Sequence, residues 1–156
     1  MKKRLTFCAL LGLLLMQTAC SYKVDVNYEE NNPEIVLSEN TNLENLRVLE
    51  LDVNHEEGKK VLNIFGEELK DGIYAYDENE HKTYILINST TKNYSDYSFK
   101  YNKEKKILTF TYTTTEGSST NNKKLFLLES NKKNPYEEIK LLNNGNEDGF
   151  IGVYTR

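Results

Sequence analysis

The segment from Asn144 to Gly149 has oxygen-bearing side chains at alternate positions, a spacing that could hold a calcium ion. Asn144, Asn146 and Asp148 would supply the oxygens, and Gly149 stands sixth, where calcium loops turn sharply. The twelfth position, which normally provides a bidentate Glu, is Thr155. An Asn/Gly/Asp turn between two strands explains the same residues. We therefore expect a turn, with Asn144, Asn146 and Asp148 as the candidate metal ligands.

Both histidines lie beside carboxylates. His55 precedes Glu56 and Glu57, and His81 follows the acidic run 77–80. Zinc sites normally use three or four converging ligands at characteristic spacing, and neither cluster has that spacing. Both clusters fall in predicted turns, where charged side chains are solvated. The sequence therefore predicts no metal and no cofactor at either place.

No pattern in the sequence points to a catalytic nucleophile. The GxSxG motif, which forms the nucleophile elbow of α/β-hydrolases, is absent. Only two cysteines, Cys8 and Cys20, occur. The sequence is rich in Asp and Glu, so a pair of carboxylates suited to glycoside hydrolysis could not be recognised from its spacing. We expect a protein that is not an enzyme, with a carboxylate-dependent hydrolase as an alternative.

The chain begins with the features of an export signal. Lys2, Lys3 and Arg4 are followed by an apolar run from Leu5 to Met16. As a helix this run would span about 18 Å, whereas a bilayer core is roughly 30 Å thick, so it is too short to remain as a transmembrane span. These features predict a signal peptide over residues 1–19.

Cys20 follows the small residues Thr18 and Ala19 at the end of this segment. The arrangement resembles the lipobox of bacterial lipoproteins, although Gln17 replaces the usual apolar residue three positions before the cysteine. The resemblance implies that Cys20 becomes the new N-terminus and carries diacylglycerol, with palmitate as an expected acyl group. Two acyl chains make a stable membrane anchor. The alternative is a secreted protein with an incidental free cysteine.

Composition bears on the source and on the partners. Abundant Lys, Asn, Ile and Tyr are typical of AT-rich genomes, which favours the outer face of a Gram-positive cytoplasmic membrane as the location. The formal net charge is −4, and removal of Lys2, Lys3 and Arg4 makes it more negative by three charges. An acidic domain gains nothing from counterion release and is repelled by anionic lipid. Nucleic acid is therefore excluded as a partner.

Behind the signal peptide, the sequence predicts a tether over residues 20–42 and one β-rich domain over 43–156. Residues 22–28 alternate between apolar and polar types, so a short strand within the tether is an alternative. The domain is predicted to be mainly β, an antiparallel sandwich or small barrel, with one short helix near 59–69. The predicted strands are 49–53, 73–76, 83–88, 97–101, 107–115, 125–129, 139–142 and 150–154, of which the second to fifth form two hairpins.

Two further groups of residues could bind a partner. Eleven tyrosines are present, and exposed tyrosines on a sheet could stack on sugars or anchor a protein. We favour their being half-buried strand residues. Lysines also surround the tip of the second hairpin, where they could touch an anionic polymer; we favour solvation of the turn and protection of an edge strand. These lysines are Lys100, Lys103, Lys105 and Lys106.

The layout from Thr83 to Leu142 loosely resembles the small-subunit (PrcB-like) family associated with a bacterial protease complex. The matching parts are the strand 83–88, Tyr97-Ser98 at the opening of the next strand, and Pro135-Tyr136 before the strand 139–142. Ser95 and Asp96 stand where the family usually has a pair of glycines. The resemblance implies a β domain that contacts a protease and does not itself cut.

Together these features lead us to expect a membrane-anchored surface lipoprotein with a non-catalytic binding or assembly role and an envelope protein as partner. A ligand- or glycan-binding lipoprotein is the first alternative.

Overall fold

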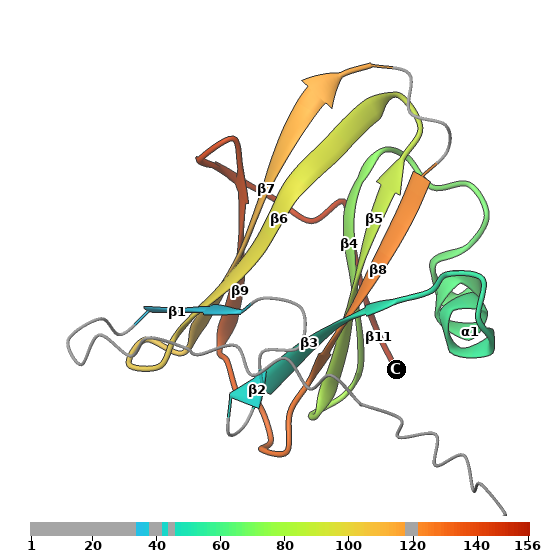
Figure 1. Cartoon of the computed structure of the whole chain (residues 1–156). Helices are drawn as coiled ribbons and strands as arrows, with labels where there is room; N and C mark the ends of the chain where they lie inside the picture. The colour runs from blue at the N-terminus through green and yellow to red at the C-terminus, as the bar shows by residue number, and fades with distance from the viewer. Residues whose placement is uncertain (1–33, 38–41, 44–45, 118–121) are drawn as a thin grey trace, which may run out of the picture.

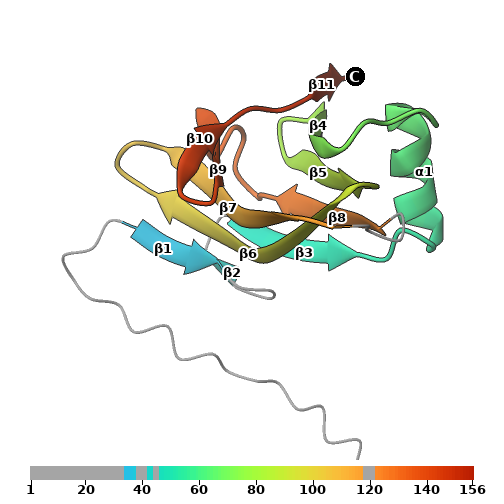
Figure 2. The same ribbon diagram turned by 90° about the horizontal axis from the view of Figure 1, so that it is seen from above.

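The computed structural model describes residues 34–37, 42–43, 46–117 and 122–156. The predicted signal peptide, Cys20 and the alternating segment 22–28 lie outside the described residues. The described chain forms a β-sandwich of two mixed sheets, with one helix packed on the outer face of the second sheet (Figure 1; Figure 2). The expectation of a mainly β domain is confirmed, and the architecture is the sandwich rather than a closed barrel.

Sheet A has the strand order β1-β6-β7-β9-β10, and sheet B has the order β11-β4-β5-β8-β3-β2. In sheet A the strands are β1 (Glu34–Leu37), β6 (Lys92–Asn102), β7 (Ile107–Glu116), β9 (Glu138–Asn143) and β10 (Asn146–Asp148). In sheet B they are β2 (Asn42–Leu43), β3 (Leu46–Leu51), β4 (Gly72–Asn79), β5 (Lys82–Ser89), β8 (Asn122–Glu129) and β11 (Gly152–Thr155).

The two predicted hairpins are present and longer than the sequence pattern suggested. β4 pairs with β5 across the turn at Glu80 and His81, and β6 pairs with β7 across the turn 103–106. Leu108, Phe110 and Tyr112 alternate with threonines along β7, and all three side chains are buried. Alternation along this strand thus places one face against the core, as a half-buried strand requires.

The core between the sheets centres on Phe110, which is fully buried and stacks on Phe99 with ring centroids 4.5 Å apart. Phe126 of sheet B packs against both rings. Tyr74, Tyr84 and the other residues on the opposite face of sheet B form a second apolar cluster with the helix. Sheet B is therefore buried on both faces, which explains why β5 reads as a nearly continuous apolar run.

The helix α1 (Glu56–Phe65) begins earlier than the predicted range 59–69 and ends earlier. Glu56 and Glu57 occupy the first turn, where carboxylates interact favourably with the helix dipole. The helix ends at Gly66, whose φ of 88° is a conformation that glycine adopts most readily. Leu69, predicted to lie on the helix, still packs into the second cluster from the following loop.

Two strand pairs are parallel, and the other strand pairs of the described chain are antiparallel. β7 pairs in parallel with β9, and β11 pairs in parallel with β4. Both pairs join strands that are distant in sequence, because a parallel neighbour requires a crossover connection. β11 also begins at Gly152, two residues after the predicted strand start.

Part of the predicted tether pairs with the domain. β1 lies within residues 20–42 and pairs antiparallel with β6, so that Glu34 lies opposite Asn102. β2 starts at Asn42, the last residue of the predicted tether, and pairs with β3.

Candidate functional site

An open cavity of about 440 Å³ lies between the sheets at the end of the sandwich that carries the β4–β5 turn. Its inner surface includes Ala75 on β4 and Leu128 on β8. The loop between β8 and β9 forms the opposite wall, and hydrogen bonds from Ser130 N to His81 O (2.9 Å) and from Asn134 N to Glu80 O (3.0 Å) tie that loop to the β4–β5 turn. The cavity therefore has a wall held in place by backbone contacts.

Three polar side chains form a hydrogen-bonded row along the cavity. Tyr136 donates its hydroxyl hydrogen to Thr83 Oγ1 over 2.6 Å, and Thr83 donates to Asp77 Oδ1, also over 2.6 Å. Burial raises the pKa of Tyr136 to about 12; the hydrogen bond with Thr83 partly offsets this, and the Asp77 charge adds to it. Tyr136 is thus a neutral donor at physiological pH. Among the described residues, Asp77 Oδ2 has no hydrogen-bond partner, so one carboxylate oxygen remains available at the cavity.

The charged groups at the rim are already paired with one another. Glu80 lies 2.5 Å from Lys133, and Glu137 lies 2.8 Å from Lys106. His81 Nδ1 lies 3.1 Å from the carbonyl oxygen of Ser130, so the ring donates through that nitrogen. These contacts fix the rim and leave it close to electrically neutral.

An apolar edge continues from the cavity. Phe150 and Val153 line it, and Val153 and the neighbouring Ile151 are 59% and 55% exposed. Val153 lies on β11, the outermost strand of sheet B. An edge strand presents unpaired backbone groups, which other chains can pair with. The site therefore combines a polar row inside with an exposed apolar strand outside.

The calcium candidates lie in a tight hairpin turn. Asn144 and Gly145 both have positive φ (50° and 80°), and Asn143 pairs with Asn146, which defines a two-residue hairpin loop. Asn146 Nδ2 donates to the carbonyl oxygen of Asn144, and Asp148 Oδ2 accepts from the Tyr112 hydroxyl over 2.6 Å. These side chains are used within the hairpin and its neighbouring strand, as the turn interpretation expects.

The histidine clusters also separate. His55 stands at the N-cap of α1, whereas His81 lies in the β4–β5 turn. Within the described ranges, no group of three or more His, Cys, Asp or Glu side chains is placed to hold a metal ion. The helix α1 is also too short and too polar to cross a membrane, and no described helix meets that requirement.

The tyrosines within the described part of the chain are buried or half-buried, which supports the interpretation that we favoured. Tyr74, Tyr76, Tyr84 and Tyr112 are each at most 5% exposed. The remaining described tyrosines have intermediate exposure and pack against one of the two apolar clusters. A platform of exposed tyrosine rings for sugar stacking is therefore not present on the described surface.

Sequence reasoning missed the row of Tyr136, Thr83 and Asp77. Asp77 drew attention only as a neighbour of His81, and Tyr136 only through the family resemblance. The one available signal was the pattern of β5, in which Thr83 occupies a core-facing position among apolar residues.

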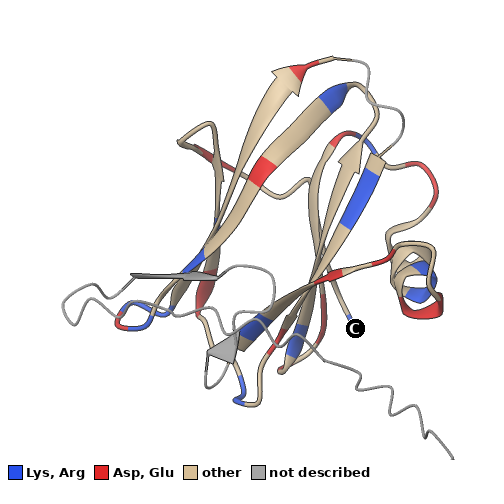
Figure 3. Ribbon diagram, viewed as in Figure 1, with Lys and Arg blue, Asp and Glu red and all other residues tan. Residues whose placement is uncertain are grey.

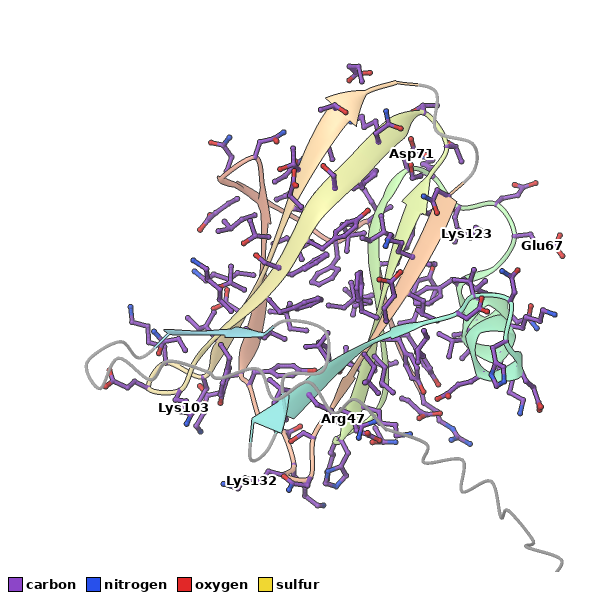
Figure 4. All side chains as sticks on the ribbon, viewed as in Figure 1. Arg47, Glu67, Asp71, Lys103, Lys123 and Lys132 are labelled. Carbon is purple, nitrogen blue, oxygen red and sulfur yellow. The ribbon has the colours of Figure 1, made fainter. Side chains whose placement is uncertain are left out.

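A second polar cluster, around Asp71, holds the opposite end of the sandwich together (Figure 4). Asp71 accepts hydrogen bonds from the backbone nitrogens of Thr90 (2.6 Å), Thr91 (2.7 Å) and Lys92 (3.1 Å), and from both threonine hydroxyls. Desolvation alone would raise the pKa of Asp71, but the hydrogen bonds from Thr90 and Thr91 outweigh it and hold the pKa well below its ordinary value. The carboxylate thereby joins the loop before β4 to the β5–β6 turn.

Asp71→Asn is expected to lower the free energy of unfolding at neutral pH by about 1–2 kcal/mol, because an amide cannot accept all of these hydrogen bonds. The wild-type contribution is fully present above the ordinary Asp pKa of 3.8 and is lost as the pH falls below it, since the unfolded state then binds the proton more readily. Urea denaturation at pH 7 and pH 3 should show a smaller difference between variant and wild type at pH 3. Glu67→Gln, which removes an exposed charge nearby, is the control; equal stability of Asp71→Asn and wild type at pH 7 would contradict the role of Asp71.

Comparisons of the chain with protein-family models, with curated proteins and with solved structures found no match. The class of protein is therefore described by its geometry alone. It is a two-sheet β-sandwich with an outer helix and a cavity open at one end.

Proposed function

We propose that the protein is a membrane-anchored surface lipoprotein whose β domain is a non-catalytic binding or assembly module. The position of Cys20 after an apolar segment and two small residues supports the anchor. The observation that carries the binding role is the cavity of about 440 Å³ that continues into the exposed edge strand β11. Ligand sites in proteins commonly have this size and this mixture of apolar surface and a few polar groups.

An envelope protein is the partner that the apolar edge favours. Val153 and Ile151 offer exposed apolar surface beside unpaired backbone groups, which suits an extended segment of another chain. The resemblance to the small-subunit family of a protease complex points in the same direction, toward a protease as that partner.

A small ligand is the second candidate, and the row of Tyr136, Thr83 and Asp77 favours it. An available carboxylate oxygen beside a buried hydroxyl suits a compound that carries hydrogen-bond donors. Such a ligand would stabilise the domain by an amount that rises with the logarithm of its concentration above the dissociation constant.

The test is affinity purification of the full-length protein from solubilised membranes, with a tag inserted between Gly117 and Asn122, away from the cavity. A stoichiometric partner should be retained by wild type and lost with Val153→Lys. Ile64→Lys is the matched control, because Ile64 is also an exposed apolar residue (42%) but lies on α1.

Absence of any partner from the wild-type preparation would contradict the assembly role. A partner retained equally by Val153→Lys would contradict the placement of its site at β11. Thermal unfolding in the presence of metabolite and glycan mixtures then tests the small-ligand candidate, with Thr83→Val as the variant expected to lose any stabilisation.

A further inference from the structure

The row of Tyr136, Thr83 and Asp77 presents only hydrogen-bond acceptors to the cavity. A carboxylate has no hydrogen to donate, so Thr83 must give its single hydroxyl hydrogen to Asp77 Oδ1. The Tyr136 hydroxyl must then donate to Thr83 Oγ1, which uses the hydrogen of Tyr136 as well. The groups that remain are the lone pairs of the Tyr136 oxygen and of Asp77 Oδ2. A ligand that satisfies this row must therefore supply the donors.

Asp77 is also the charged side chain of the cavity wall that lacks a counter-charge, since it forms no ion pair with any residue that the structure describes. The other charged residues of the wall are paired, namely Glu80 with Lys133, Glu137 with Lys106, Glu138 with Lys140, and Lys82 with Glu129. Red and blue segments accordingly lie close together at this end of the sandwich (Figure 3). A ligand with one positive charge would complete the pairing.

The wall beside Asp77 is apolar. Ala75 lies two residues before Asp77 on the same face of β4, and Val153 lies opposite Ala75 on β11. The apolar wall is completed by Leu128, Ile139 and Phe150. A carboxylate beside apolar surface is less well solvated than one in open water, so it gains more from a partner of opposite sign. The cavity thus offers an apolar surface with one anionic acceptor at its side.

We propose that the cavity binds a small organic molecule that carries a primary ammonium group on an apolar body, an inference that names the ligand of the small-ligand candidate above and rests on it. An ammonium group has three donors and no acceptor, which matches the row. It donates to Asp77 Oδ2 and to the Tyr136 oxygen, and the apolar body lies against Leu128 and Phe150. The volume of about 440 Å³ suits a small molecule rather than one side chain of a partner.

Other classes of ligand match the wall less well. An uncharged sugar brings hydroxyl donors, but it leaves the charge of Asp77 without a partner and sets polar groups against the apolar wall. An anion is repelled by Asp77 and finds no free donor in the row. The ammonium ion alone satisfies both the charge and the hydrogen-bonding requirement.

The experiment uses phenylbutylamine as the probe, added to the full-length protein in nonionic detergent. Phenylbutanol and phenylbutyrate carry the same apolar body with a neutral and a negative head group, and they are the matched compounds. Thermal unfolding is followed by circular dichroism. We expect the amine to raise the unfolding temperature in a saturable manner, and the alcohol and the acid at equal concentration to leave it unchanged.

Asp77→Asn keeps an acceptor for Thr83 and removes the charge, and it should raise the dissociation constant of phenylbutylamine by about tenfold or more. Glu78→Gln is the matched control, because it removes the same charge from the next position of β4, which does not line the cavity. This variant should bind the amine within about twofold of wild type. The unfolding curve of Asp77→Asn without ligand shows whether that variant is folded.

Equal stabilisation by phenylbutanol, or equal affinity of Asp77→Asn and wild type for the amine, would overturn the proposal. Tighter binding of Nα-acetyl-lysine amide would overturn the small molecule and assign the ammonium group to a lysine of a partner chain. Stabilisation by another compound of the metabolite and glycan mixtures, with none by phenylbutylamine, would overturn the amine and leave the small-ligand candidate intact. Retention of a partner at β11 is measured separately, so failure of the assembly role is distinguishable from failure of this inference.

Discussion

Cys20→Ala is expected to abolish membrane anchoring. In the proposed lipoprotein the sulfur of Cys20 holds the diacylglycerol, and each buried CH₂ of an acyl chain contributes about 0.8 kcal/mol to membrane binding. Without the thiol there is no attachment point, so the precursor should stay unprocessed or be released. Detergent partitioning and the mass of the mature protein measure the outcome directly.

Cys8→Ala is the matched control, because Cys8 lies in the apolar part of the predicted signal peptide and would be removed with it. This variant should be processed and anchored like the wild type. Normal processing and membrane retention of Cys20→Ala would refute the lipoprotein assignment.

Gly58→Ala is expected to destabilise the domain by about 2–3 kcal/mol, although alanine normally stabilises a helix relative to glycine. Gly58 is buried in the first turns of α1. A Cβ there would lie 2.3 Å from the Asp52 carbonyl oxygen and 2.9 Å from Val53 Cα, both of them backbone atoms. The helix would have to move away from the end of β3, which would loosen the second apolar cluster. Urea denaturation measures the loss.

Gly149→Ala makes the same chemical change where no atom lies within 4 Å of the added Cβ, and we expect its stability to stay within about 0.5 kcal/mol of wild type. A Gly58→Ala variant as stable as wild type would show that the contact between α1 and the β3–α1 connection is adjustable.

The hairpins could be predicted from the sequence because their information is local. β6 and β7 carry aromatic and β-branched residues with a period of two, separated by a short polar turn. The start of α1 was less accessible, because the N-cap residue is His55, which makes no side-chain capping hydrogen bond. The predicted helix extended too far because Leu69 fits the apolar spacing, whereas the helix of the structure ends at Phe65, with Gly66 as its C-cap.

The parallel pairs and the cavity could not be predicted, because they depend on contacts between distant segments. Alternation in the last strand indicates a strand but does not say that Gly152 pairs with Tyr74. Thr83 and Tyr136 are 53 residues apart, so no spacing rule joins them.

β11 has a consequence for when the domain can finish folding. Its partner β4 is followed by six further strands of the two sheets before β11 itself is made, so one edge of sheet B stays open throughout synthesis. Pairing over such a separation in sequence forms slowly, because the long loop must close first. Under the export that we propose, a chain whose sheet is completed so late would reach the membrane before it had folded.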